Sequence, residues 1–354
     1  MMQTFEVVGF DNGYDYVKVV SGSDKEGKKI FPSTTFEPVG VSIADNNITG
    51  NEFNINKMSL TFQGKEYYVG NYAVEQDPRG GSKDFNDDKF RNPSELVKLL
   101  AGISLYAEEK EIEIKQLVVG LNIENYTKYN KDMVNALQDK TFKYKINEEQ
   151  YLLEVGNVLC ISQGVGAYYD QLLDYNGGVY DGDLLDARYS LIDVGGRTVD
   201  AFIAKGMDII TGTDIGVNYG MSDAFKEVSK QLGGEIPYSI IEQDYREGKT
   251  KTFWKGQKHN IDTLCKQSFN NLAERIYNLL MNEWDKQINR VEFVILCGGG
   301  SKYLEKYLSE MFDIEVKTAN NAQFSNANGY YKIGIYNQQE QDKEDNQGGT
   351  DKEA

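Results

Sequence analysis

Histidine and cysteine are scarce in this chain of 354 residues, which has one histidine and three cysteines. The single histidine, His259 in the polar stretch KGQKHN, excludes a histidine-rich metal site, and a Ser-His-Asp triad would have to use this residue. The cysteines lie far apart and match neither a disulfide framework nor a metal-binding pattern. We therefore expect Cys160, Cys265 and Cys297 to be buried thiols in a reducing cytoplasm.

Basic residues and long apolar runs are also few. The chain has 38 Lys and Arg against 55 Asp and Glu, which gives a net charge of -17. An acidic chain repels phosphate backbones and anionic lipids, so direct binding to nucleic acid or to a membrane surface is not expected. No apolar run approaches the length that crosses a bilayer, and the N-terminal MMQTFEVVGF does not have the pattern of a signal peptide. We therefore expect a cytoplasmic protein.

Proline is scarce too, with 5 residues against 35 glycines, which suits regular elements joined by tight turns. Alternating apolar and polar residues predict strands, and apolar residues spaced three or four apart predict helices. The strands predicted near the N-terminus cover residues 5–10, 16–21 and 29–36, followed by a hairpin that turns at Gln63-Gly64. Helices are predicted at 93–109, 126–138 and 166–175, and strands at 114–122 and 144–161.

The second part of the chain opens with a similar order of elements. Three strands are predicted over residues 189–212, followed by helices at 221–232 and 261–288 and by a strand, glycine turn and helix in VEFVILCGGGSKYLEKYLSEMF. The pattern predicts two α/β domains and a tail. The first domain comprises residues 1–160 plus 315–336, the second comprises 161–314 with a subdomain insertion at 235–260, and we expect the acidic tail, 337–354, to be disordered.

Two short motifs repeat within this pattern. In FDNGYDYVKVV, Asp11-Asn12-Gly13 separates two apolar runs, which is the signal of a tight hairpin turn, and Lys18 follows seven residues after Asp11. In the second half, Asp193-Val194-Gly195-Gly196 is followed by Asp200, again seven residues after its aspartate. An internal repeat of this kind predicts two duplicated halves that face one cleft.

The residue types of the repeated motif fit a polyphosphate with a divalent cation. Glycines let backbone N–H groups approach phosphate oxygens, and the Thr198 hydroxyl adds a donor. Lys18 can contact phosphate as a point charge. Asp11 and Asp193 would hold Mg²⁺, mainly through its water shell, because a bare carboxylate would repel a triphosphate.

Two further stretches place polar or small residues between a strand and a helix. In ILCGGGSKYL, the backbone of Gly298, Gly299 and Gly300 could lie against an adenine and its ribose. In CISQGVGAYYD, Gln163 could orient a water for attack on a γ-phosphate, or could simply be a polar residue at a helix start. Taken alone, each stretch is a common feature of α/β proteins.

Taken together and in this order, the four motifs resemble the two phosphate motifs, the first connecting motif and the adenosine motif of the superfamily of actins, heat-shock chaperone ATPases and sugar kinases. The motifs span residues 11 to 301. The resemblance implies an α/β, actin-like fold with duplicated, ribonuclease-H-like βββαβαβα domains and a nucleotide cleft between the two domains.

Within that superfamily, the stretches GKEYYVGNYAV, LVVGLNIENY and QGVGAYYD resemble the ParM-type bacterial actins that segregate plasmids. The length fits an actin core with few insertions, so we do not expect a chaperone with its substrate domain, and no membrane-attaching element of the MreB type is evident. Two positions depart from the pattern: Ser162 stands where relatives often have Pro, and Tyr14 where many have a small residue.

The resemblance also implies roles for the motif residues. Gln163 would position the attacking water, Asp11 and Asp193 would hold Mg²⁺ and its waters, and ATP, with GTP as an alternative, would be the nucleotide. The residues expected to contact the nucleotide are Asn12, Gly13, Tyr14, Lys18, Gly195, Gly196, Arg197, Thr198, Gly298, Gly299, Gly300 and Ser301.

The function that the resemblance implies is that of a polymerising ATPase in the bacterial cytoplasm. ATP would favour head-to-tail filaments of the chain with itself, hydrolysis would weaken them, and a DNA-binding adaptor at a centromere-like plasmid site would couple them to DNA. Two alternatives stay open. A small-molecule kinase of the same superfamily would need a catalytic carboxylate, for which Asp200 is the candidate. A non-polymerising regulator would share only the fold.

Overall fold

The computed structural model describes residues 1–38, 53–77, 92–180 and 182–348. The chain divides into two compact α/β units, the first formed by Met1–Tyr180 and Asn326–Ala354, the second by Asp181–Ser325. The sequence placed these boundaries differently, at residues 160 and 315. Residues 161–180 instead belong to the first unit, because the helix within them packs on that unit's last helix. Residues 315–325 belong to the second unit, because they include its last strand.

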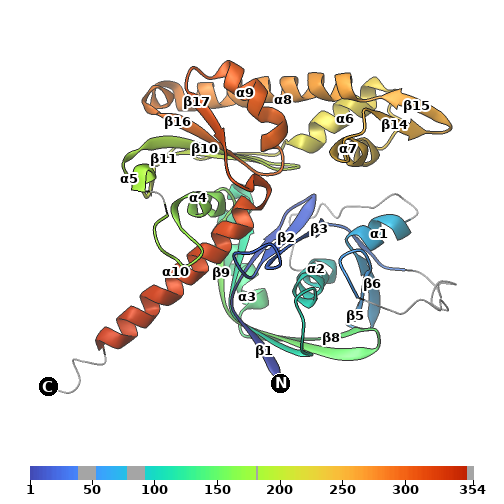
Figure 1. Ribbon diagram of the computed structural model, residues 1–354, viewed down its shortest axis with the longest axis vertical. Coiled ribbons are helices and arrows are strands. Elements are labelled where there is room, and N and C mark those ends of the chain that lie inside the picture. Colours follow the sequence, from blue (N-terminus) through green and yellow to red (C-terminus); the bar gives the residue numbers. More distant parts are fainter. Residues whose placement is uncertain (39–52, 78–91, 181, 349–354) are drawn as a thin grey trace. The chain divides into compact units, whose positions relative to one another are not determined.

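In its described part, the first unit has one nine-stranded sheet in the order β3-β2-β1-β7-β9-β8-β5-β6-β4 (Figure 1). The strands are β1 (Met2–Asn12), β2 (Tyr16–Val20), β3 (Lys28–Pro32), β4 (Thr35–Phe36), β5 (Met58–Phe62), β6 (Lys65–Val69), β7 (Glu111–Leu121), β8 (Lys140–Ile146) and β9 (Glu149–Ser162). The helices are α1 (Asn71–Gln76), α2 (Pro93–Ser104), α3 (Ile123–Leu137), α4 (Val165–Leu172) and α10 (Ser325–Gly348).

The centre of this sheet is parallel and covered on both faces. β1 and β9 both pair parallel with β7, and residues 116–121 of β7 are all buried. Such unbroken burial is typical of a strand with a helix layer on each side. On one face, Val8 and Phe10 share a core with apolar residues of α2 and α3. On the other face, Gly9 and Gly120 lie against Ala327 and Tyr330 of α10.

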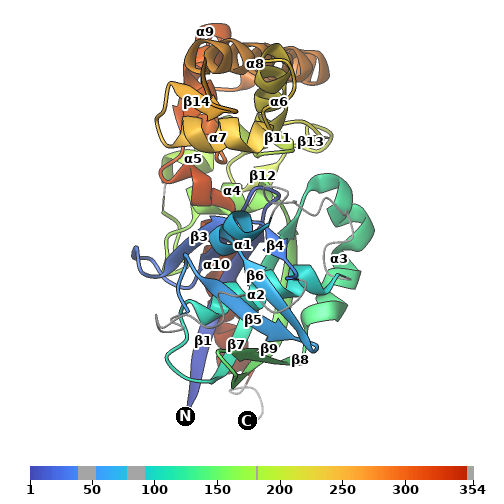
Figure 2. The same cartoon turned by 90° about the vertical axis from the view of Figure 1, so that its right-hand side faces the viewer.

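The hairpin predicted at Gln63-Gly64 is confirmed. β5 and β6 pair antiparallel, and both turn residues have positive φ, 51° and 79°. Left-handed residues in a two-residue loop match the twist of the flanking strands, and Gly adopts this conformation without a steric penalty. Figure 2 shows this hairpin next to β8, with which β5 pairs.

The acidic tail that the sequence predicts to be disordered from residue 337 is helical as far as Gly348, because α10 continues through it. Gln338 Nε2 donates to the Glu6 carbonyl oxygen at 3.0 Å, and Gln339 Nε2 donates to that of Asn176 at 2.6 Å. A helix that is already nucleated by packing extends easily through Gln, Glu and Lys, which have high helix propensity. Residues 349–354 lie outside the described part.

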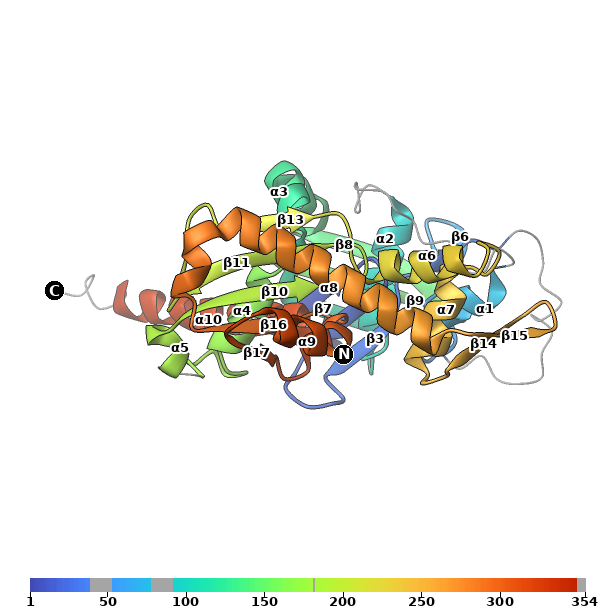
Figure 3. The ribbon, with the colours of Figure 1, turned by 90° about the horizontal axis from the view of Figure 1, so that it is seen from above.

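The described part of the second unit has a six-stranded sheet in the order β12-β11-β10-β16-β17, with β13 also paired to β11. Its strands are β10 (Arg188–Val194), β11 (Val199–Lys205), β12 (Asp208–Ile209), β13 (Ile215–Val217), β16 (Phe293–Cys297) and β17 (Glu315–Thr318). Its helices include α5 (Gly182–Asp186), α6 (Met221–Gln231), α8 (Asp262–Trp284) and α9 (Ser301–Met311). Helix α8 lies across β10 and β11 (Figure 3), and Phe269 and Ile276 of this helix pack in one core with Ile192 and Val199 of the strands.

The segment at 235–260, which the sequence describes as a polar, irregular insertion, is instead regular. It contains α7 (Tyr238–Arg246) and the antiparallel hairpin β14 (Lys251–Trp254) and β15 (Gln257–Asn260), which turns at Lys255-Gly256. Thr252 Oγ1 donates to Asp244 Oδ2 at 2.6 Å and fastens the hairpin to α7. Sequence patterns miss this hairpin because its strands are only four residues long and bury few residues, so no alternation of apolar and polar residues is visible.

The cysteines are buried and free, as predicted. In the ranges that the structure describes, no helix combines the length and apolar character of a membrane span.

Candidate functional site

The first Asp-x-Gly motif lies where β1 ends and β2 begins. The register places Asp11 directly opposite Lys18, and Lys18 Nζ donates to Asp11 Oδ2 at 2.9 Å. The side chains are 3% and 15% exposed, so this ion pair is largely shielded from water. The seven-residue spacing therefore reflects cross-strand pairing in a hairpin.

Gly13 is required in this turn for space, and not for a left-handed conformation. Its φ lies outside the left-handed region, and the connection from Asn12 to its cross-strand partner Val17 contains four residues, so it is longer than the two-residue turn that Asn-Gly predicts. A Cβ at residue 13 would lie 2.7 Å from the Tyr16 carbonyl oxygen and 3.1 Å from Lys18 Nζ. Tyr14, the unusual residue of the motif, is half-buried.

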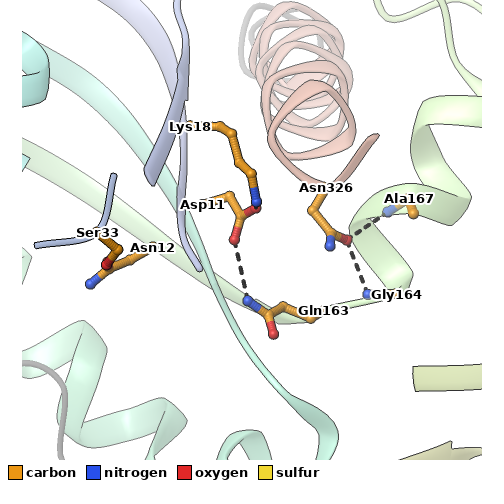
Figure 4. A network of polar contacts seen from close by, with 8 residues as sticks. All are labelled: Asp11, Asn12, Lys18, Ser33, Gln163, Gly164, Ala167 and Asn326. Carbon is orange, nitrogen blue, oxygen red and sulfur yellow. Dashed lines mark hydrogen bonds and ion pairs between the residues drawn. The ribbon is translucent and has the colours of Figure 1, made fainter. Parts of the chain in front are cut away.

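Gln163 follows β9 directly and lies beside this turn. Its Nε2 donates to Asp11 Oδ1 at 3.2 Å (Figure 4). Its backbone N–H donates to the Leu121 carbonyl oxygen at 2.6 Å. Asp11 therefore accepts hydrogen bonds from both Lys18 and Gln163. Asp11, Lys18 and Gln163, all predicted site residues, thus form one polar cluster, although Gln163 is 152 positions from Asp11.

Asn326 is a residue of this cluster that the sequence patterns missed. Its Oδ1 accepts from the backbone N–H groups of Gly164 at 3.0 Å and Ala167 at 3.1 Å (Figure 4). These groups belong to the start of α4, whose N-cap residue, Gly164, has no side chain to satisfy them. Asn326 comes from α10, so a distant helix holds the turn that carries Gln163. No local signal could reveal a contact across 162 positions.

Asn12 turns away from the other residues of its motif. Successive side chains of a strand point to opposite faces. Accordingly, Asp11 contacts Lys18 and Gln163, while Asn12 Nδ2 donates to Glu95 Oε2 of α2 at 2.5 Å. A contact of Asn12 with a nucleotide would thus involve its backbone.

The second Asp-x-Gly motif has the same register as the first. Asp193 on β10 lies directly opposite Asp200 on β11, and the Gly195 N–H closes the turn by donating to the Thr198 carbonyl oxygen at 2.9 Å. Both aspartates are buried, with 6% and 1% of their surface exposed. The predicted repeat is therefore a structural repeat, but the residue opposite the aspartate is another carboxylate.

Helix α6 supports the glycine turn of the second motif. The Met221 N–H donates to the Gly195 carbonyl oxygen at 3.1 Å, and the Ser222 N–H donates to that of Gly196 at 2.8 Å. Both carbonyls of the turn thus point into the helix start. The negative ends of these two carbonyl dipoles therefore point toward the helix, and not toward an anion bound at the turn.

The triple-glycine turn lies beside the second motif. Because β10 and β16 are parallel neighbours, Asp193 is level with Cys297, and the chain after Cys297 passes close to it. A Cβ at Gly298, whose φ is 81°, would collide with Asp193 Oδ1, and the Gly300 N–H donates to the Val194 carbonyl oxygen at 3.0 Å. Ser301 Oγ donates to the Gly298 carbonyl oxygen at 2.8 Å, which fixes the turn at the start of α9.

The chemistry of these groups suits magnesium bound together with phosphate. Within the described ranges, no three or more His, Cys, Asp or Glu side chains gather in a group that could hold a metal ion. Mg²⁺ is commonly held by one or two carboxylates together with waters and substrate phosphates. Asp193 and Asp200 lie opposite each other in the register, so this strand pair provides two carboxylates, a number that such a cation commonly takes.

Two family models match the chain in sequence order. The model "Actin like proteins N terminal domain" matches residues 9–166, and the model "Archaeal actin homologue MreB-like, C-terminal" matches residues 191–310. These ranges contain every predicted site residue. No curated protein sequence matches the chain.

Solved structures resemble the chain over nearly its whole length. They include the archaeal actin homologue Ta0583 in complex with ADP (20% identity, TM-score 0.73, covering 93% of this chain and 98% of that one). The ParM of a 15-stranded filament from Clostridium botulinum shares 21% identity, with a TM-score of 0.75 and coverage of 94% and 99%. The actin-like protein Alp7A shares 15%, with a TM-score of 0.78 and coverage of 98% and 100%. With two actin-family models matched in order and an actin-like fold throughout, the chain belongs to the actin-like proteins.

Proposed function

We propose that this chain binds ATP with Mg²⁺, hydrolyses it, and assembles head-to-tail into filaments whose lifetime depends on the bound nucleotide. One observation carries the proposal. The Asp-x-Gly turn occurs in both units with the same cross-strand register, Asp11 opposite Lys18 and Asp193 opposite Asp200. That the two turns share one nucleotide stays a prediction.

The first turn would contact phosphate and position water. Lys18 provides a cationic Nζ, and the space at Gly13 lets the backbone approach an anion. Gln163 would orient the attacking water through its amide, whose nitrogen is held by Asp11. Because Asp11 contacts both side chains, it can couple the position of the water to that of the lysine.

The second turn would hold the cation and the adenosine. Asp193 would bind Mg²⁺, mainly through its waters, and bound Mg²⁺ would neutralise charge that develops on the phosphates. Gly195, Gly196 and Thr198 would line the phosphates. The turn at 298–300 lies beside Asp193 and would contact the adenosine.

Filament assembly is proposed from the family. Head-to-tail contacts are heterologous and do not close, so a chain that makes one can continue to add copies. The filament structure of the Clostridium botulinum ParM supports this mode for a protein with the same fold. A net charge of -17 favours a DNA-binding adaptor over direct contact with DNA, which fits plasmid segregation in a bacterial cytoplasm.

Light scattering and pelleting of the purified protein test the proposal. Mg-ATP should produce a rise in scattering that decays as phosphate is released, and EDTA added beforehand should prevent it. ADP should give no lasting polymer. Absence of nucleotide binding and of assembly at every concentration tried would contradict the proposal.

The same preparation also tests the kinase alternative. Transfer of the γ-phosphate to a sugar or a small acid, without assembly, would favour that function.

A further inference from the structure

A buried ion pair joins the first two turns of α2, outside every motif. Lys98 Nζ is 2.8 Å from Glu95 Oε1, and the two side chains are 3% and 5% exposed. Removing two charges from water is unfavourable, and such a pair is often no more stabilising than apolar residues of the same size. Its presence at this point therefore calls for a reason other than stability.

The second oxygen of the Glu95 carboxylate connects the pair to the first Asp-x-Gly turn. Glu95 Oε2 accepts from Asn12 Nδ2 at 2.5 Å, and Asn12 Oδ1 lies 3.5 Å from Ser33 Oγ. The Ser33 N–H in turn donates to the Asp15 carbonyl oxygen at 2.9 Å. The turn is thus fastened near both of its ends, and Glu95 provides the charged contact.

This fastening is on the opposite side of β1 from the proposed chemistry. Figure 4 shows Asn12 and Ser33 on one side of the strand and Asp11 with Gln163 on the other. Asp11 and Asn12, which are neighbours in β1, thus have different partners on opposite sides of the strand. Asp11 contacts Lys18 and Gln163, while Asn12 anchors the same piece of backbone to α2.

We propose that Glu95 is a positioning residue for the phosphate turn, acting through Asn12, and that Lys98 holds the Glu95 carboxylate in its orientation. The part that concerns nucleotide affinity rests on the proposed function. The part that concerns the turn itself does not. A hydrogen bond to a charged acceptor is about twice as strong as one between neutral groups, which suits a fixed loop.

Two double variants separate positioning from general stability. Glu95→Met with Lys98→Met removes both charges and the acceptor for Asn12, while leaving apolar groups of similar size. Glu95→Gln with Lys98→Met removes the same charges but keeps an oxygen that can accept from Asn12. The two proteins differ at residue 95 alone, where Gln provides an amide oxygen and an amide NH2 and Met provides neither, so each is the control for the other.

Amide hydrogen exchange without nucleotide is the first measurement. Exchange at residues 13–16 should be about tenfold faster in the Met/Met variant, because it lacks the bond, and intermediate in the Gln/Met variant, whose neutral acceptor makes a weaker bond. Exchange in the central strand β7 should be the same in both. Equal exchange of the turn in the two variants would overturn the proposal, whatever the protein's activity.

The affinity for Mg-ADP, measured by calorimetry, is the second measurement. We expect binding about tenfold weaker in the Met/Met variant and an intermediate loss of affinity in the Gln/Met variant. If the wild type binds no nucleotide, the proposed function fails while the exchange result still decides the role of Glu95. Faster exchange with unchanged affinity would overturn the link from Glu95 to the ligand.

Discussion

The two Asp-x-Gly turns have the same backbone register, but the residues opposite their aspartates carry opposite charges. In the first unit the aspartate faces a lysine and forms an ion pair at 2.9 Å. In the second unit the aspartate faces a second aspartate, and both are buried. The shared backbone register therefore determines which two side chains face each other in each turn. The types of those two residues determine what the turn can bind. We propose Asp193 as the stronger candidate for the cation, because a second carboxylate, that of Asp200, lies opposite it.

The largest effect is expected at Asp193. Asp193→Ala should abolish measurable ATP hydrolysis, because it removes the carboxylate proposed to hold the hydrated Mg²⁺. Phosphate release under saturating Mg-ATP is the measurement, and an unchanged circular dichroism spectrum controls for folding. Wild-type turnover in this variant would show that the metal assignment is wrong.

A substitution of Lys18 tests the charge balance of the first turn. Lys18→Met leaves a buried carboxylate with only neutral donors, and we expect the free energy of unfolding to fall by about 3 kcal/mol. Asp11→Asn combined with Lys18→Met should recover most of that loss, since no uncompensated charge remains. Denaturant titration compares the three proteins, and equal stability of single and double variants would contradict the ion-pair argument.

Gln163→Ala tests whether the first turn also positions the water. Hydrolysis should slow about a hundredfold, since the amide that orients the water is lost, while nucleotide binding stays. Filaments should consequently persist longer in the scattering assay. Filaments that decay at the wild-type rate would exclude this role for Gln163.

Buried thiols provide a test in which the two units should behave alike. Burial raises the pKa of Cys160 in the first unit to about 12, and that of Cys265 in the second unit to about 12. The unfolded chain loses these protons near pH 9 while the folded chain keeps them. The stabilisation is therefore complete below about pH 9 and is lost as the pH rises toward 12.

For each thiol the free energy of unfolding should fall by up to about 1.4 kcal/mol per pH unit in this window. Urea titrations at pH 8, 9 and 10 measure the slope, which Cys160→Ala and Cys265→Ala should each reduce. A slope that neither substitution changes would contradict the argument.

The smallest effects concern the helices that follow the motifs. In the first unit α4 is capped from a distance by Asn326, whereas in the second unit Asp223 of α6 itself accepts from the Gly220 N–H at 3.0 Å. Asn326→Ala should lower the free energy of unfolding by about 1 kcal/mol, because two N–H groups lose their acceptor, and Asp223→Ala by about half as much. Thermal melts of both variants measure the difference, and the reverse order would contradict it.

Much of the site was predictable because its elements are local. Asp-x-Gly turns between apolar runs predict strand ends wherever they occur, and the seven-residue spacing to Lys18 and Asp200 is the spacing of cross-strand partners. The four motifs, taken in order, resemble those of the actin superfamily, and that resemblance implied the actin-like fold. The sequence did not predict the observed domain boundaries, the regular structure of 235–260 or the helical tail. All three depend on packing between distant segments.

The sequence by itself determined which backbone turns form and which charges they carry, since both follow from residue types a few positions apart. Only the tertiary structure decided that Gln163 contacts Asp11, that Asn326 caps α4 and that Glu95 holds Asn12. These pairs are 83 to 162 positions apart. A hydrogen bond at such separation exists because parallel strands bring their ends to one edge of the sheet and helices pack over both faces, and no spacing within the sequence encodes that approach.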